Sequence, residues 1–139
     1  MEGLERFVEA QDRDYAAALA EIRNGFKKSH WIWFVFPQLR GLGMSYMSSF
    51  YGIAGLEEAK AYLAHPVLGA RLREISAALL AHEGQAAWAI LGEIDAMKVR
   101  SSMTLFDAVC PDSVFGQVLN AFYEGGRDEV TLSMLGVKA

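Results

Sequence analysis

Apolar residues recur at helical spacing along most of the chain. The clearest example is the segment 66–82, in which Leu68, Leu72, Ile75 and Leu79 follow one another at intervals of three or four residues. This spacing places the four side chains on one face and predicts an amphipathic helix that buries that face in a core. Similar patterns predict further helices over residues 4–8, 14–24, 45–51, 56–65, 85–91, 95–106, 114–123 and 128–135.

Residues that favour helix ends flank most of these segments. The pair Asn24-Gly25 is expected to end the second helix, because glycine readily adopts the backbone conformation that closes a helix. Side chains that can accept hydrogen bonds from the first backbone N–H groups precede the later helices, and the candidate N-caps are Asp14, Ser45, Asp95, Asp112 or Ser113, and Asp128. Glycine lies at nearly every junction, and no Pro- or Ser-rich linker divides the chain. The pattern predicts an all-α fold in which residues 1–139 form one compact domain, a multihelical array of short and medium helices.

The segment Lys28–Gln38, with the sequence Lys-Ser-His-Trp-Ile-Trp-Phe-Val-Phe-Pro-Gln, departs from this amphipathic pattern. Its residues 31–36 are six consecutive large apolar side chains, which form either a buried strand or a buried helix. We favour a helix with Ser29 as its N-cap, because only one other stretch could pair with a strand here and an unpaired strand leaves backbone groups without partners. Six bulky residues cover every side of such a helix, so we expect it to be buried all round. The alternative is an aromatic platform for a ligand, and the polar ends of the run, His30 and Gln38, are the parts expected to touch one.

Composition and charge narrow the class of protein. The chain has 139 residues, of which 53% are hydrophobic and 22% charged, and this balance fits one folded domain and argues against a disordered chain. Its net charge of −4 provides no positive field for nucleic acid or anionic lipid. Neither is therefore expected as a partner.

Cysteine usage and hydropathy point to the cytoplasm. Cys110 is the single cysteine, so no intrachain disulfide can form, and this suits a reducing compartment. Residues 1–7 are charged and amphipathic and lack the pattern of a signal peptide. The longest apolar run, residues 31–36, is far shorter than the ~18 residues that span a bilayer. We predict a soluble cytoplasmic protein without a membrane segment.

The histidines offer one candidate for acid–base chemistry. His30 is that candidate, because the pKa of a histidine lies near neutrality, and the alternative is a histidine that only hydrogen-bonds a neighbouring loop. His65 and His82 are placed at predicted helix ends, where they are expected to contact terminal carbonyl groups. The three histidines are far apart and no HxxxH or CxxC spacing occurs, so the sequence predicts no metal site.

A second group of candidate residues lies on the helix predicted to begin at Asp95. Asp95, Lys98 and Ser102 recur at helical spacing, and Ser101 is adjacent. A lysine that is buried among apolar neighbours requires an anion or shifts its pKa, so these residues can form an anion or carbonyl site with Lys98 as the charge and the serine hydroxyls as donors. A Ser–Lys hydrolytic pair is a narrower version of this hypothesis. The alternative is structural: Asp95 caps the helix and pairs with Lys98, and the hydroxyls bond back to the helix.

The glycine-containing segment 38–45 is the third candidate. Gly41-Leu-Gly43, together with Arg40, Lys27 and Lys28, can hold an anion at a helix N-terminus. The alternative is a tight connection between two short helices. The glycines lack the GxGxxG and Walker spacings of nucleotide cofactor sites, and no cofactor is predicted.

Three separated segments resemble a known protein family. They are Lys28–Gln38, then Tyr51–Ala59 leading into Tyr62–Gly69, then Asp95–Lys98 followed by Ser101–Phe106. Together they resemble the bacterial family of unknown function called domain of unknown function 1810, and the resemblance extends from Leu4 to about Leu135. It implies an all-helical protein of cytosolic type and brings no reaction with it.

Two functions are consistent with these residues, and the sequence does not decide whether the protein is an enzyme. The first is a small-molecule-binding or enzymatic domain with a pocket for an anionic or nucleotide-like ligand. We favour it because placing polar groups beside the most apolar segments costs about 1–3 kcal/mol each unless they are paired. Its candidate residues are His30 and Lys98 for catalysis, and Trp33, Gln38, Arg40, Ser45, Tyr51, Asp95, Ser101 and Ser102 for binding. The second is a non-enzymatic interaction or oligomerisation domain, whose motifs direct folding and whose exposed apolar patch binds a partner or a second copy.

Overall fold

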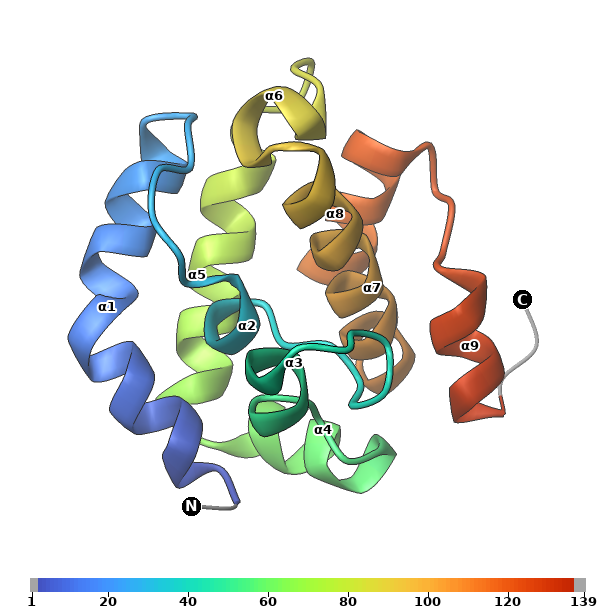
Figure 1. Ribbon diagram of the computed structural model, residues 1–139. Helices are drawn as coiled ribbons and strands as arrows, with labels where there is room; N and C mark the ends of the chain where they lie inside the picture. The colour runs from blue at the N-terminus through green and yellow to red at the C-terminus, as the bar shows by residue number, and fades with distance from the viewer. Residues whose placement is uncertain (1–2, 137–139) are drawn as a thin grey trace.

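The computed structural model describes residues 3–136, and these residues form nine helices and no β-strand (Figure 1). In chain order they are α1 (Glu5–Arg23), α2 (Ile32–Val35), α3 (Tyr46–Phe50), α4 (Leu56–Ala64), α5 (Leu68–Leu80), α6 (Ala87–Leu91), α7 (Glu93–Val109), α8 (Val114–Tyr123) and α9 (Glu129–Leu135). The prediction of an all-α fold is confirmed. None of the helices within residues 3–136 is long and apolar enough to cross a membrane.

The core lies where α8 packs against both α5 and α7 (Figure 1). Helix α1 covers α5 on one side of the molecule, and α9 covers α7 on the other. The face of α5 that the spacing predicts, Leu68, Leu72, Ile75 and Leu79, is at most 1% exposed. That amphipathic helix is confirmed, although it begins at Leu68 and not at Pro66.

The N-terminal region forms one long helix, and the prediction of two short ones was wrong. Helix α1 is continuous for 19 residues, and Asp14 lies inside it rather than at a helix start. An aspartate alone does not break a helix, and no glycine or proline lies nearby to do so. The predicted end is confirmed: Asn24 is the C-cap, and Gly25 follows with a φ of +76°.

The predicted caps divide into two groups. The Ser45 hydroxyl accepts a hydrogen bond from the Ser48 N–H at 3.1 Å, and an Asp128 carboxylate oxygen accepts one from the Thr131 N–H at 2.9 Å, so both caps are confirmed. Asp95 was wrong as a cap, because α7 begins two residues earlier, after Gly92.

At the start of α8, neither predicted cap residue accepts a hydrogen bond from a backbone N–H group of the helix. Ser113 precedes this helix as predicted, but its hydroxyl donates to the Cys110 carbonyl at 2.7 Å and caps no N–H group. Asp112 adopts a φ of +58° and also provides no side-chain cap. The hydroxyl of Ser113 therefore ties α8 to the end of α7.

The aromatic run contains a helix, but one shorter than predicted. Helix α2 has four residues, and its N-cap is Trp31, without a side-chain cap. Ser29 was wrong as the cap, because its hydroxyl donates to the Glu21 carboxylate. Five of the six apolar side chains are at most 2% exposed, whereas Trp33 is only half-buried, so burial on every side was also wrong.

The segment after α2 pairs once with the segment after α3. The Arg40 N–H donates to the Ile53 carbonyl, and the Ile53 N–H donates to the Gln38 carbonyl, both at 2.8 Å. In Figure 1 the loop that follows passes in front of α7 toward α9. This pairing fixes where Gln38 meets the face of α7.

Candidate functional site

Side chains from three segments line a groove between α7, α9 and the loop that follows Gln38. Its volume is about 330 Å³, and it is lined by Gln38, Leu42, Gly43, Ile94, Met97, Lys98, Ser101, Asp128 and Val130. We call it the α7–α9 groove. It brings together three residues that the sequence predicts for a site, namely Gln38, Lys98 and Ser101.

Helix α7 presents a second face to this groove, separate from its core face. Ile94, Met97, Lys98 and Ser101 follow the i, i+3, i+4, i+7 pattern of one helix side and all line the groove. Ile94 and Met97 are each 71% exposed. Both side chains therefore belong to the groove face and not to the core face of α7.

Lys98 is held in place but keeps hydrogen-bonding capacity. Its Nζ lies 5.3 Å from the centre of the Trp33 ring and 4.0 Å from Asp95 Oδ1. The other oxygen of Asp95 pairs with Lys27 Nζ at 2.8 Å. The predicted Asp95–Lys98 pair is present, yet the shorter ion pair of Asp95 is with Lys27. The ammonium of Lys98 makes no hydrogen bond to a described residue, so its donors can serve a ligand.

The two serines of α7 have different surroundings. Ser101 lines the groove, and its hydroxyl donates to the Met97 carbonyl at 3.3 Å, as the structural alternative predicts. Ser102 is 0% exposed, and its hydroxyl has no hydrogen-bond partner among residues 3–136. The Trp33 Nε1 is likewise buried without a partner in that range. Ser102 therefore does not face the groove, and neither hydroxyl bonds Lys98 within the described chain.

Asp128 is a groove residue that the sequence did not identify. Its Oδ2 accepts hydrogen bonds from the Thr131 N–H and hydroxyl, at 2.9 and 2.5 Å. Its own N–H donates to the Thr104 hydroxyl at 2.9 Å. Oδ1 makes no hydrogen bond within the part of the chain that the structure describes. The sequence explained Asp128 as a cap, which it is, and held no further signal that this residue would line a groove.

The N-terminal end of the segment Lys28–Gln38 belongs to a structural cluster around Glu21. The Glu21 carboxylate accepts hydrogen bonds from the Lys28 N–H at 2.7 Å, from the Ser29 N–H and hydroxyl, and from Trp31 Nε1 at 2.9 Å. Desolvation raises the pKa of Glu21, but these hydrogen bonds outweigh it and lower the pKa to about 2. Beside it, Lys27 Nζ donates to the Ser29 carbonyl at 2.5 Å. We call these residues the Glu21 cluster, and it joins α1 to the aromatic run.

A second structural cluster surrounds Arg6, which the sequence reasoning missed. The Arg6 guanidinium is 3% exposed and donates to both oxygens of Glu58, at 3.0 and 3.2 Å. It also donates to the carbonyls of Gly3, Phe50 and Gly52. Desolvation raises the pKa of Glu58, but its hydrogen bonds with Arg6 and Ala54 lower it overall. This Arg6 cluster ties α1 to α3 and α4.

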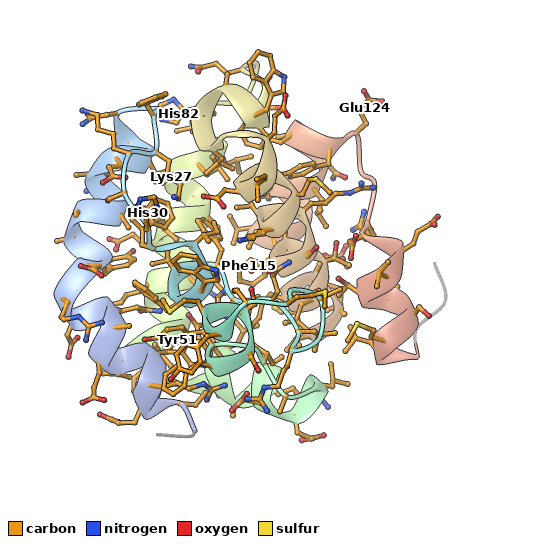
Figure 2. The ribbon with its side chains drawn as sticks, viewed as in Figure 1. Lys27, His30, Tyr51, His82, Phe115 and Glu124 are labelled. Atoms are coloured by element: carbon orange, nitrogen blue, oxygen red, sulfur yellow. The ribbon has the colours of Figure 1, made fainter. Side chains whose placement is uncertain are left out.

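Besides Trp33, Asp95 and Ser102, four more predicted site residues are not part of the groove lining. His30 is exposed in the connection between α1 and α2 (Figure 2), and its ring makes no hydrogen bond to a described residue. The Arg40 guanidinium donates to the carbonyls of Ser49 and Gly52, both at 3.1 Å. Ser45 caps α3. Tyr51 lies between α1 and α3 (Figure 2), where its ring packs against other aromatic rings.

The positions of His30 and Lys98 test whether the two predicted catalytic residues share one site. His30 does not share the groove with Lys98, so the two predicted catalytic residues do not form one site in this structure. Their catalytic roles stay predictions. Within residues 3–136, no three His, Cys, Asp or Glu side chains are grouped so that they could hold a metal ion.

Comparisons with known proteins place the chain in a family. No curated protein matches it. It is similar to the crystal structure of the conserved hypothetical protein Rv1873 from Mycobacterium tuberculosis, with 45% sequence identity, a TM-score of 0.94 and coverage of 97% of each chain. Residues 1–135 match the family described as protein of unknown function (DUF1810). The resemblance carried by the three motifs is confirmed, and the chain belongs to the DUF1810 family.

Proposed function

We propose that this protein binds a small anionic ligand with an apolar body in the α7–α9 groove. One observation carries the proposal: the groove combines a lysine, an amide and a hydroxyl with exposed apolar walls. The lysine is Lys98, and the exposed walls include Ile94 and Met97 at 71% and Val130 at 57%. Concave sites with mostly apolar walls and a few polar groups are typical of small-molecule binding.

The charges of the groove favour a single negative charge on the ligand. Lys98 is the one Lys or Arg among its lining residues, as far as the described chain goes, and Asp95 and the lining residue Asp128 partly balance it. Lys28 and Arg40, which could have joined it at a phosphate site, line no part of the groove. A nucleotide triphosphate would therefore remain largely uncompensated, whereas one carboxylate can take the charge-assisted hydrogen bonds of Lys98.

A direct binding measurement tests this proposal. We would titrate 3-phenylpropanoate, its neutral amide and adenosine monophosphate into the protein by isothermal titration calorimetry, and follow the same ligands by thermal shift. We expect the carboxylate to bind best, because only it combines one charge with an apolar body. Lys98→Gln should weaken its binding about tenfold, in line with a charge-assisted bond of about 1.4 kcal/mol.

Lys60→Gln is the matched control, because Lys60 is exposed on α4 and its one ion pair among residues 3–136 is with the exposed Glu57. It should leave binding unchanged. If the neutral amide binds as well as the carboxylate, or if both lysine variants bind like the wild type, the anion proposal is wrong.

The exposed apolar side chains also favour a second candidate function, an interaction or oligomerisation domain. The walls of the α7–α9 groove, together with Met134 at 48% exposure on α9, are of the kind that can bury against a protein surface. Light scattering after size-exclusion chromatography would test the homo-oligomer. A dimer that Ile94→Asp converts to a monomer supports this candidate, and a monomer at high concentration contradicts it.

We also propose a cytoplasmic location and no nucleic-acid partner. The single cysteine supports the location, because it suits a reducing compartment. The net charge of −4 supports the absence of a nucleic-acid partner, because it provides no positive field for one. Fractionation of cells that express the tagged chain tests the location.

A further inference from the structure

The α7–α9 groove carries two opposite charges that do not neutralise each other. Lys98 and Asp128 both line it, yet no ion pair within 4.0 Å joins them. Asp128 forms no salt bridge to any described residue. Two opposite charges that are not paired with each other in one small groove mark a place where a ligand with both charges would be held at both ends.

The scaffold positions each charge and leaves part of it available. The backbone of Asp128 is tied to Thr104 of α7, and its Oδ2 is engaged by Thr131, so Oδ1 is the oxygen left for a ligand. Lys98 is placed by the Trp33 ring and by Asp95. Groups held in this way lose little freedom when a ligand binds.

An apolar anion alone would leave Asp128 uncompensated. Such a ligand, bound through Lys98, would cover the Asp128 carboxylate and remove water from it without replacing the lost hydrogen bonds. It would also bring its own negative charge near that carboxylate. A ligand with an ammonium group beside its carboxylate avoids both penalties.

We propose that the natural ligand class of this groove is a zwitterionic α-amino acid with an apolar side chain. Its carboxylate would be bound by Lys98 and the Gln38 amide, and its ammonium by Asp128 Oδ1. Its side chain would pack against Ile94, Met97 and Val130. A volume of about 330 Å³ is at the small end for ligand sites and suits a ligand of this size.

This inference rests on the proposed function, because it requires that the groove bind a carboxylate. It adds a separate claim, which is that the amino group contributes affinity through Asp128. The two claims can fail separately.

The test compares three ligands that share a phenyl body: L-phenylalanine, 3-phenylpropanoate, which lacks the amine, and 2-phenylethylamine, which lacks the carboxylate. Each would be titrated into the full chain by calorimetry. We expect L-phenylalanine to bind at least about tenfold more tightly than either single-charge ligand, which is the value of one charge-assisted bond. L-leucine and L-methionine should behave like L-phenylalanine, because the apolar walls recognise no particular shape.

The decisive variant is Asp128→Asn. Asparagine has the same shape and also caps helices well, so α9 should stay folded, which circular dichroism would verify. We expect the variant to bind L-phenylalanine and 3-phenylpropanoate within about twofold of each other, because the ammonium has lost its partner. Glu129→Gln is the matched control: it removes the same charge from the next residue, which is exposed and does not line the groove. It should keep the wild-type preference.

Three results would overturn the inference. If the wild type binds 3-phenylpropanoate as tightly as L-phenylalanine, the groove does not use the amine, although the anion proposal stands. If Asp128→Asn weakens both ligands equally, Asp128 acts on the structure and not on the amine. If none of the carboxylates or amino acids binds the wild type, the proposed function fails together with this inference.

Discussion

The Glu21 cluster and the α7–α9 groove lie at opposite ends of the aromatic run, and they use their polar groups in different ways. The Glu21 carboxylate accepts four hydrogen bonds, from Lys28, Ser29 and Trp31. In the groove, the ammonium of Lys98 and Oδ1 of Asp128 have no hydrogen-bond partner among residues 3–136. We call a cluster saturated when its charged groups already have hydrogen-bond partners within the protein, and such a cluster supports the fold. Charged groups at a concave surface that can still form hydrogen bonds are available to a ligand.

This difference separates two parts of one sequence motif. Lys28, Ser29 and Trp31 contribute to the Glu21 cluster, and Gln38 contributes to the groove. Changes in the saturated clusters should reduce stability, and changes in the groove should mainly reduce binding. Variants of the two kinds of region should therefore separate loss of stability from loss of binding.

The Arg6 cluster should give the largest loss of stability. Arg6→Met removes five hydrogen bonds and the ion-pair partner of Glu58, although the Gly52 carbonyl keeps its bond from Arg40 and Glu58 keeps its bond from the Ala54 N–H. Breaking a buried ion pair in this way typically costs about 3–5 kcal/mol. Urea unfolding followed by far-ultraviolet circular dichroism would measure it. Arg13→Met, at an exposed position of the same helix, should change the unfolding free energy by less than about 0.5 kcal/mol. Equal effects of the two variants would contradict a saturated, stabilising Arg6 cluster.

Glu21 should make stability depend on pH. Its pKa is about 2 in the folded protein and near 4.5 when unfolded, so its contribution is fully present above about pH 5. It is lost as the pH falls toward 2, because the unfolded state then binds the proton more readily. Allowing for partial exposure, we expect a contribution of about 1–3 kcal/mol.

The measurement compares the unfolding free energies of the wild type and Glu21→Gln between pH 7 and about pH 2.5. The difference between them should be largest at neutral pH and shrink on acidification, because the wild-type carboxylate becomes protonated. Glu9→Gln, at an exposed position of α1, is the control and should show no such trend. A difference that is independent of pH would argue against the low pKa.

Two buried hydroxyls of α7 allow the same comparison within one helix. The Thr104 hydroxyl donates to the Arg100 carbonyl at 2.8 Å and accepts from the Asp128 N–H at 2.9 Å, whereas that of Ser102 has no partner in the described chain. Thr104→Val should destabilise the protein by about 1–2 kcal/mol, because the N–H at the start of α9 loses its acceptor. Ser102→Ala should change the unfolding free energy by less than about 1 kcal/mol, or raise it. Denaturant unfolding of both variants decides the matter, and a larger loss for Ser102→Ala would reverse our interpretation.

Local patterns predicted much of the fold, and tertiary contacts account for the errors. The apolar face of 66–82 and the caps Ser45 and Asp128 depend on neighbouring residues, and all three are confirmed. The break at Asp14 was wrong because helix continuity depends on the packing of a whole face. Ser29 was wrong as a cap because its partner, Glu21, lies outside the local pattern.

The site was predictable only in part, because tertiary contacts also decide which residues line it. Lys98, Ser101 and Gln38 are unusual for their apolar surroundings, and they could be found from the sequence. Ile94 and Met97 could also have been found, because with Lys98 and Ser101 they form a second face on α7. The position of Asp128 beside this face could not have been found, because it depends on how α9 packs against α7. In the sequence, a cap residue looks the same whether or not its second oxygen is free.

Lys98 itself should contribute least to stability. Its ion pair with Asp95 spans 4.0 Å, and Asp95 keeps its shorter pair with Lys27 when Lys98 is replaced. The contact with the Trp33 ring adds about 0.5–1 kcal/mol at a partly exposed site, and glutamine retains part of that packing. We expect Lys98→Gln to lower the unfolding free energy by no more than about 0.5 kcal/mol while weakening carboxylate binding about tenfold. Thermal unfolding and calorimetry on the same preparation measure both quantities. A variant that loses 2 kcal/mol or more would place Lys98 with Arg6 and Glu21 among the stabilising residues, and the contrast between the groove and the saturated clusters would then fail at its central residue.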